Sequence, residues 1–143
     1  MKSDKGFTIT ELLVVAAIFF LMVAILTPFV NITKWRSRRI ACANNLRELS
    51  LGLHKYAAQH NDSFPEKLGD LYPDYVAGEK AFDCPAIKNV GRKEAPDYQY
   101  SAGMTEASAP REVLVRDNEG NHGKSGGNIM RVNGSVEWSG SGR

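Results

Sequence analysis

The sequence predicts an α+β protein in which one long N-terminal helix packs on a small antiparallel sheet. Residues 12–26 form an uninterrupted apolar run of the 143-residue chain, and an amphipathic segment follows it. Near the C-terminus, short apolar runs alternate with turn residues, and Asn133-Gly134 separates the last two. Such a pair between apolar runs is the strongest short hairpin signal. We therefore expect a membrane-type helix joined to one small soluble domain.

The first part of the helix, residues 7–30, is predicted to be a transmembrane or filament-core segment. Residues 8–30 would span roughly 34 Å as a helix, which is enough to cross a bilayer. The run ends in residues 25–29, Ile-Leu-Thr-Pro-Phe, which offer no small-residue cleavage site of the secretory type. An anchor therefore explains this segment better than an ordinary signal peptide.

Glu11 is the feature that a plain anchor does not explain. A carboxylate at bilayer depth costs about 2.5–3.5 kcal/mol, and no basic residue lies beside it. Cleavage between Gly6 and Phe7 would free a cationic α-amine four residues earlier. In packed helices, the amine of one chain could pair with Glu11 of a neighbour and offset the desolvation of both charges.

The segment Gly6-Phe7-Thr8-x-x-Glu11-Leu12 resembles the processing motif of type IV prepilins and type II secretion pseudopilins. The resemblance implies a pilin-like fold and removal of residues 1–6 as a leader. It also implies a membrane peptidase that cuts after Gly6 and methylates the new N-terminal Phe7. Glu11, the fifth mature residue, would direct assembly, and Pro28 at mature position 22 is a further feature of the family.

Residues 31–61 are predicted to continue the helix as an amphipathic segment. Pro28 has no N–H and should kink or weaken the helix. Beyond it, apolar residues recur three or four positions apart, which is typical of a helix with one buried face. This expected stripe consists of Ile32, Trp35, Ile40, Ala43, Leu46, Leu49, Leu53, Tyr56 and Ala57. The helix should end near residues 60–63, a turn-rich cluster before Pro65.

Residues 62–143 are predicted to form a soluble loop and antiparallel sheet. Residues 64–73 indicate a loop with a short helical turn, and residues 117–127 a Gly/Asn-rich loop. The expected strands are residues 97–101, 112–116, 128–132 and 135–138.

A second resemblance is to a large group of prepilin-type proteins whose function is poorly defined beyond their N-terminus. It rests on Cys42-x-x-Asn45-Leu46, Leu53-His54-x-Tyr56, Cys84-Pro85 and residues 127–138. Tails in that group carry a His, nine residues and then Asp-Gly. Here ten residues separate His122 from Asn133, and Asn133 stands where Asp is usual.

Two cysteines, Cys42 and Cys84, leave two interpretations open. A disulfide would close a loop of about 40 residues and contribute roughly 3–4 kcal/mol in the chain-entropy model. Alternatively, one is a helix cysteine packed against the sheet and the other is a separate loop cysteine. No spacing of Cys and His suggests zinc.

No cofactor is expected, apart from a weak candidate site for calcium. Calcium prefers oxygen ligands on a flexible loop, although acidic turns are common without it. The candidate ligands are Asp117, Asn118, Glu119 and Asn121. His122 could approach Asp117 or Glu119, but no nucleophile–base pairing is visible, so no enzyme activity is expected.

The formal net charge of +2 favours no particular partner. The basic residues 34–39 fit contacts with anionic headgroups or neighbouring subunits better than nucleic acid, so no nucleic acid is expected. They also oppose the family orientation under the positive-inside rule, but the cleavage site is useful only on the cytoplasmic side.

The function expected from these observations is a structural subunit of a pilin-like filament, in particular a type II secretion pseudopilin. Its partners would be the membrane, copies of itself, other pilin-like subunits, a prepilin peptidase, an assembly platform and an ATPase. It would cross the inner membrane once, with the soluble domain outside the cytoplasm, and then join a periplasmic or extracellular filament. The alternatives are a surface type IV pilin for adhesion, motility or DNA uptake, and a tethered binding protein that never polymerises.

Overall fold

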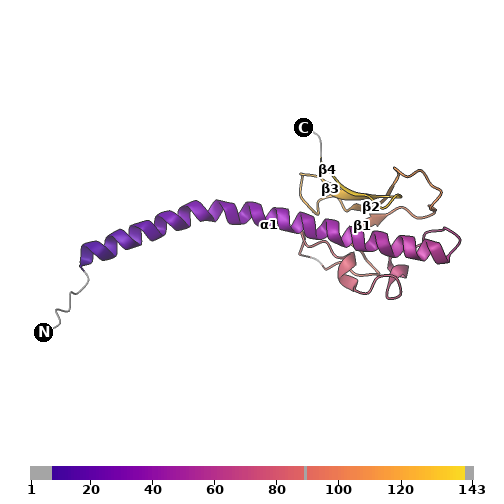
Figure 1. The fold of residues 1–143 in the computed structure, drawn as a ribbon, viewed down its shortest axis with the longest axis horizontal. Helices are drawn as coiled ribbons and strands as arrows, with labels where there is room; N and C mark the ends of the chain where they lie inside the picture. Colours follow the sequence, from indigo (N-terminus) through magenta and orange to yellow (C-terminus); the bar gives the residue numbers. More distant parts are fainter. Residues whose placement is uncertain (1–7, 89, 141–143) are drawn as a thin grey trace. The chain divides into compact units, whose positions relative to one another are not determined.

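The computed structural model describes residues 8–88 and 90–140 of the chain (Figure 1). Its longest element is α1, Ile9–Gln59, which contains Pro28. The chain divides into two compact units, Met1–Arg36 and Ser37–Arg143.

In the first unit, α1 exposes its apolar side chains. Leu12, Phe20 and Leu26 are each at least 60% exposed. By length and hydropathy, α1 is the one helix among the described residues that could cross a membrane. Pro28 does not end the helix, although it cannot donate to the carbonyl four residues earlier. One residue before it, the Thr27 hydroxyl donates to the Val23 carbonyl at 2.6 Å.

The second unit contains a four-stranded antiparallel sheet in the order β1-β2-β3-β4. Both ends of each strand lie within one residue of the predicted bounds. The strands are β1 Tyr98–Tyr100, β2 Val113–Asp117, β3 Gly127–Arg131 and β4 Val136–Ser139. The α+β class predicted from the sequence, with a long N-terminal helix and a small antiparallel sheet, is confirmed.

The predicted Asn-Gly turn joins β3 to β4. Gly134 has φ +80°, which is the left-handed region that favours glycine. The Asn133 side-chain oxygen accepts the Ser135 N–H at 3.0 Å, and the Ser50 hydroxyl of α1 donates to the Gly134 carbonyl at 3.4 Å. The turn is therefore held both by its own residues and by the helix.

The core of the second unit surrounds the end of α1. A stripe of buried helix residues faces the sheet and the segment that carries the 3₁₀-helices η1, Leu68–Leu71, and η2, Glu79–Phe82. Figure 1 shows the sheet on one side of this part of α1 and the η1–η2 segment on the other. The buried stripe consists of Cys42, Leu46, Leu49, Leu53 and Ala57.

The start of the predicted stripe was wrong. Ile40 is 60% exposed, whereas Cys42 is fully buried. Cys42 lies four residues before Leu46 and so shares its face, but Ile40 lies six residues before it, about 120° away around the helix. Trp35 belongs to the first unit, and the side chain of Ile32 lies outside the described residues.

Candidate functional site

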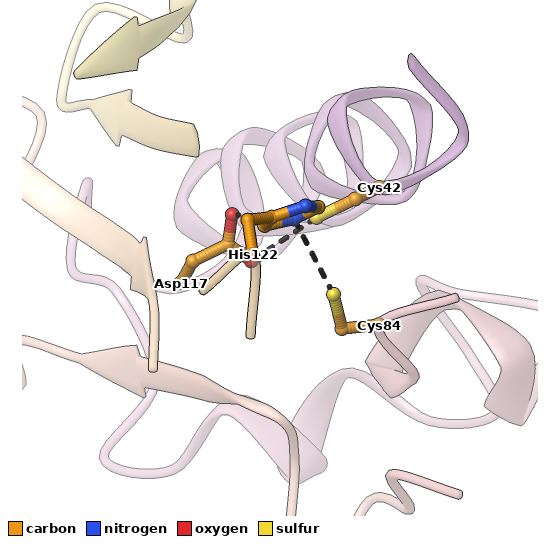
Figure 2. A group of neighbouring side chains, drawn as sticks. All are labelled: Cys42, Cys84, Asp117 and His122. Atoms are coloured by element: carbon orange, nitrogen blue, oxygen red, sulfur yellow. Dashed lines mark hydrogen bonds and ion pairs between the residues drawn. The ribbon is translucent and has the colours of Figure 1, made fainter. Parts of the chain in front are cut away.

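Four buried side chains from separate segments converge beside the end of the sheet. Cys42 comes from α1, Cys84 from the loop after η2, Asp117 from the end of β2 and His122 from the loop before β3 (Figure 2). Each offers one ligand-type atom, and these four atoms all lie within 4.8 Å of one another. We call these four residues the Cys–Asp–His cluster.

Local structure explains how each member reaches the cluster. Cys42 is the first residue of the buried stripe of α1. Along β2, Val115 is buried, Arg116 is exposed and Asp117 is buried, so strand alternation turns the Asp117 carboxylate toward the helix. The backbone N–H of Cys84 donates to an Asp97 carboxylate oxygen at 3.0 Å, which fixes the loop that carries this thiol.

Short contacts link the four side chains. The Cys42 thiol donates to Asp117 Oδ1 at 3.0 Å. His122 Nε2 lies 3.2 Å from Asp117 Oδ2 and 3.5 Å from Cys84 Sγ. His122 Nδ1 is buried and has no hydrogen-bond partner among the described residues. The imidazole therefore directs only its Nε2 into the cluster.

Burial and mutual hydrogen bonds shift the pKa values of the side chains in the cluster. Burial acts to lower the pKa of His122, but the hydrogen bonds to Asp117 and Cys84 outweigh it and raise the pKa to about 9. Burial acts to raise the pKa of Asp117, but hydrogen bonds from His122, Cys42 and the Asn128 N–H hold it below its usual range. The hydrogen bond with Cys42, against the opposing effect of burial, lowers the pKa of the Cys84 thiol to about 6. The hydrogen bonds within the cluster therefore favour the ionised form of Asp117 and the protonated form of His122.

This arrangement offers two kinds of chemistry. Two thiols, an imidazole and a carboxylate form a donor set for a metal ion, and the two sulfurs lie within 4.8 Å of each other. Both cysteines are free thiols in the structure, so the disulfide stays a prediction. The approach of His122 to Asp117 was expected from the sequence, but the spacing gave no indication that Cys42 and Cys84 would join them, because both cysteines lie far away along the chain.

The four candidate calcium ligands differ in their hydrogen-bond partners and in their exposure. Both carboxylate oxygens of Asp117 contact members of the Cys–Asp–His cluster. The Asn121 side chain donates to the Asp97 carbonyl at 2.8 Å. Glu119 is exposed and Asn118 is half-buried. Calcium binding here stays a prediction.

At the start of α1, Thr8 and Glu11 form a reciprocal cap. The Thr8 N–H and hydroxyl donate to Glu11 Oε2 at 2.9 and 2.8 Å, and the Glu11 N–H donates to Thr8 Oγ1 at 3.3 Å. This is the capping box of a Thr-x-x-Glu sequence, a signal that the sequence analysis missed. Glu11 is exposed; Gly6 and Phe7 lie outside the described residues.

Comparison with known families gives two matches. Residues 1–27 match the family described as prokaryotic N-terminal methylation motif. This N-terminal segment is prepilin-like. Residues 36–80 match a family described as protein of unknown function (DUF1559).

The two matches confirm the predicted relationship to prepilins. The methylation motif indicates a type IV pilin-like substrate of a prepilin peptidase, and it covers Gly6, Phe7 and Glu11. The apolar part of α1 fits a membrane-anchored pilin-like protein. No curated protein and no solved structure matches the chain.

Proposed function

We propose that this chain is a structural subunit, not an enzyme, of a pilin-like filament of the type II secretion pseudopilus kind. A prepilin peptidase would cut between Gly6 and Phe7 and methylate Phe7. The subunit would then leave the membrane through an assembly platform driven by an ATPase. It would join copies of itself and other pilin-like subunits.

The observation that carries the proposal is a methylation motif followed directly by an exposed apolar helix. The motif match covers residues 1–27. In the same segment, large side chains such as Leu13, Phe19 and Phe20 are more than 60% exposed. An exposed apolar surface of this extent needs lipid or another protein to cover it. A filament subunit uses both in turn, lipid before assembly and neighbouring helices after it.

Pairing of charges supports assembly over simple anchoring. Glu11 is exposed at the first turn of α1, within a surface that is otherwise apolar. In a filament core, the Phe7 amine of a neighbouring chain would compensate this carboxylate. An uncompensated buried charge would cost about 3–5 kcal/mol. Assembly out of register would therefore be disfavoured.

The pseudopilus is proposed over a surface pilus because the soluble part is small. The second unit has one four-stranded sheet and short 3₁₀ segments beside the helix. Within the family that the processing motif resembles, a soluble part this short favours a secretion filament that stays within the periplasm.

The first experiment is the intact mass of the chain made in cells with and without a prepilin peptidase. We expect a peptidase-dependent species that begins at methylated Phe7. Replacing Gly6 with a larger residue should block the cut, whereas replacing Asp4 should not. An unprocessed Met1, or a cut at another bond in peptidase-containing cells, would contradict the proposal.

A deletion strain separates the proposed filament types. Loss of a secreted protein from the medium without loss of surface filaments supports the pseudopilus. Loss of filaments from a sheared surface fraction would instead identify a pilus. A processed chain that cannot be cross-linked to itself or to other pilin-like subunits would identify a tethered binding protein.

A further inference from the structure

We propose that Cys42, Cys84, Asp117 and His122 bind one Zn²⁺ ion that holds the soluble unit together. The site is distinct from the assembly function, because all four ligands lie in the second unit and none lies in the methylation motif. Its role would be structural, since four protein ligands complete a tetrahedral zinc site and leave no open position for a substrate.

The geometry of the four donor atoms is close to that of a bound site. Zinc lies about 2.3 Å from sulfur and about 2.0–2.2 Å from nitrogen or oxygen, so tetrahedral ligand atoms are about 3.3–3.8 Å apart. Here Cys84 Sγ and His122 Nε2 are 3.5 Å apart, and His122 Nε2 and Asp117 Oδ2 are 3.2 Å apart. The Cys42 Sγ to Asp117 Oδ1 distance is 3.0 Å. The other pairs of donor atoms lie within 4.8 Å of one another, so side-chain shifts of up to about 1 Å would bring all four ligands to tetrahedral distances.

The chemistry of the donors selects the metal. Thiolate sulfur together with imidazole nitrogen favours zinc over magnesium or calcium, which prefer oxygen ligands. Two thiolates and one carboxylate carry three negative charges, of which Zn²⁺ would neutralise two. Without a cation, a thiolate at Cys42 would be strongly disfavoured, because its thiol donates to the buried carboxylate of Asp117. Binding would release the Cys42 thiol proton and the His122 Nε2 proton to solvent.

Surrounding hydrogen bonds hold the ligands in place. The Asn128 N–H donates to Asp117 Oδ2 at 2.6 Å. The Tyr98 hydroxyl lies 3.7 Å from Cys42 Sγ and donates to the Asp83 carbonyl at 2.9 Å. The Cys84 N–H is held by Asp97. Such outer contacts orient metal ligands and are typical of protein metal sites.

A disulfide between Cys42 and Cys84 is the competing interpretation. It would leave more of the buried polar side chains of the cluster without a bonding partner than zinc would. Oxidation would remove the thiol proton that Cys42 donates to Asp117 Oδ1. It would also leave the contact between His122 and Cys84 without a thiol. A disulfide needs only the two cysteines, whereas zinc also engages the buried carboxylate and imidazole. This difference makes the two interpretations separable by variants of Asp117 and His122.

The test uses the full chain, purified in detergent from its membrane without chelator or oxygen. We expect one zinc per chain by elemental analysis, and an intact mass that corresponds to two free thiols after the metal is removed. Cobalt exchanged into the site should give thiolate-to-cobalt charge-transfer absorption. A chelator should lower the Tm of the chain by about 5 °C or more, and Zn²⁺ but not Mg²⁺ should restore it.

Matched variants decide between a metal site and a disulfide. His122→Gln and Asp117→Asn should each lower zinc affinity by about tenfold or more. His60→Gln and Asp74→Asn alter exposed residues outside the cluster and should retain zinc. Should the cluster variants fail to fold, the metal content and thiol state of the unaltered chain still give the answer. A zinc-free chain that takes up no Zn²⁺, or one whose mass is lower by two hydrogens, would overturn the proposal.

Discussion

At the scale of single residues, Asn45 ties α1 to the loop that carries Cys84. Its side-chain amide donates to the Lys80 carbonyl at 3.0 Å and to the Asp83 carbonyl at 2.7 Å. Both carbonyls flank the end of η2. The contact therefore fixes the approach of this loop to the helix, one helical turn from Cys42.

We predict that Asn45→Ala lowers the free energy of unfolding by about 1–3 kcal/mol, because two hydrogen bonds between the helix and the loop are lost, one of them partly buried. The neighbouring Asn44→Ala is the matched control. Asn44 is exposed and only accepts a hydrogen bond from Arg47 at 2.8 Å, so its loss should cost less than about 0.5 kcal/mol. Denaturant unfolding followed by tryptophan fluorescence measures both, and equal losses would contradict the assigned role of Asn45.

Glu11 has one role in the structure and a second, proposed role in assembly, and variants can separate the two. In the structure, it completes a capping box with Thr8, and in a filament it would meet a neighbour's amine. Loss of a helix cap costs about 0.5–2 kcal/mol. An unpaired charge in the filament core costs about 3–5 kcal/mol. The charge should therefore dominate assembly.

We predict that Glu11→Gln abolishes filament assembly although it keeps the cap, because Gln also serves in a capping box. Thr8→Ala removes the cap but keeps the charge, and should leave most of the assembly. The measurement is the amount of cross-linked oligomer in membranes, after the N-terminal mass has shown that both variants are processed. Normal assembly of Glu11→Gln together with failure of Thr8→Ala would show that capping, not charge, is what matters.

At the scale of elements, the β3–β4 turn combines a backbone requirement with a packing requirement. Gly134 has φ +80°, and a Cβ there would lie 3.0 Å from both His54 Nε2 and Ser50 Oγ of α1. Gly103 has nearly the same φ, +82°, but a Cβ there would have no neighbour within 4 Å. Comparing substitutions at Gly103 and Gly134 therefore separates the cost of backbone strain from the cost of a steric contact with α1.

We predict that Gly103→Ala costs about 1–2 kcal/mol, the penalty for an L-residue in the left-handed region. Gly134→Ala should cost a further 1 kcal/mol or so, because His54 and Ser50 must also move. Thermal unfolding of the two variants in the same detergent gives the difference. If the two losses were equal, the turn would not be packed against α1 in the way described.

The elements themselves were predictable because their signals are local. The strand bounds follow from alternation and from Asn133-Gly134, and the helix follows from apolar spacing. Asp117 was not predicted correctly as part of β2, because the polar run that follows made it resemble a loop residue. The strand extends to Asp117, and this one residue moves its carboxylate from the expected loop to the buried face.

At the scale of the whole molecule, the Cys–Asp–His cluster could not be predicted from spacing. Its members lie at positions 42, 84, 117 and 122, and only packing of the helix, the loop and the sheet brings them within 4.8 Å. Periodicity can place Cys42 on a helix face, but it contains no information about which loop meets that face. By contrast, the N-terminal motif is contiguous, so the relationship to prepilins could be inferred from the sequence.

The orientation of the chain in the membrane is a property of the whole molecule, and two physical effects compete for it. Lys34, Arg36 and Arg38 are exposed after the apolar segment, and basic residues favour the cytoplasmic side. Each would contribute about 1 kcal/mol near an anionic surface. Processing at Gly6 requires the opposite orientation, because the peptidase acts on the cytoplasmic side in the family that the chain resembles.

We predict that the second unit lies outside the cytoplasm, because only then can Gly6 be cut. A protease added to spheroplasts should degrade this unit and leave a cytoplasmic marker intact. Replacing Lys34, Arg36 and Arg38 with Gln should increase the processed fraction, since the opposing charges are removed, whereas the same change at Arg92, Lys93 and Lys124 should not. A second unit protected until the spheroplasts are lysed would mean that the basic residues decide the orientation. In that case Gly6 would face away from the peptidase, and the N-terminus of the same sample should be unprocessed.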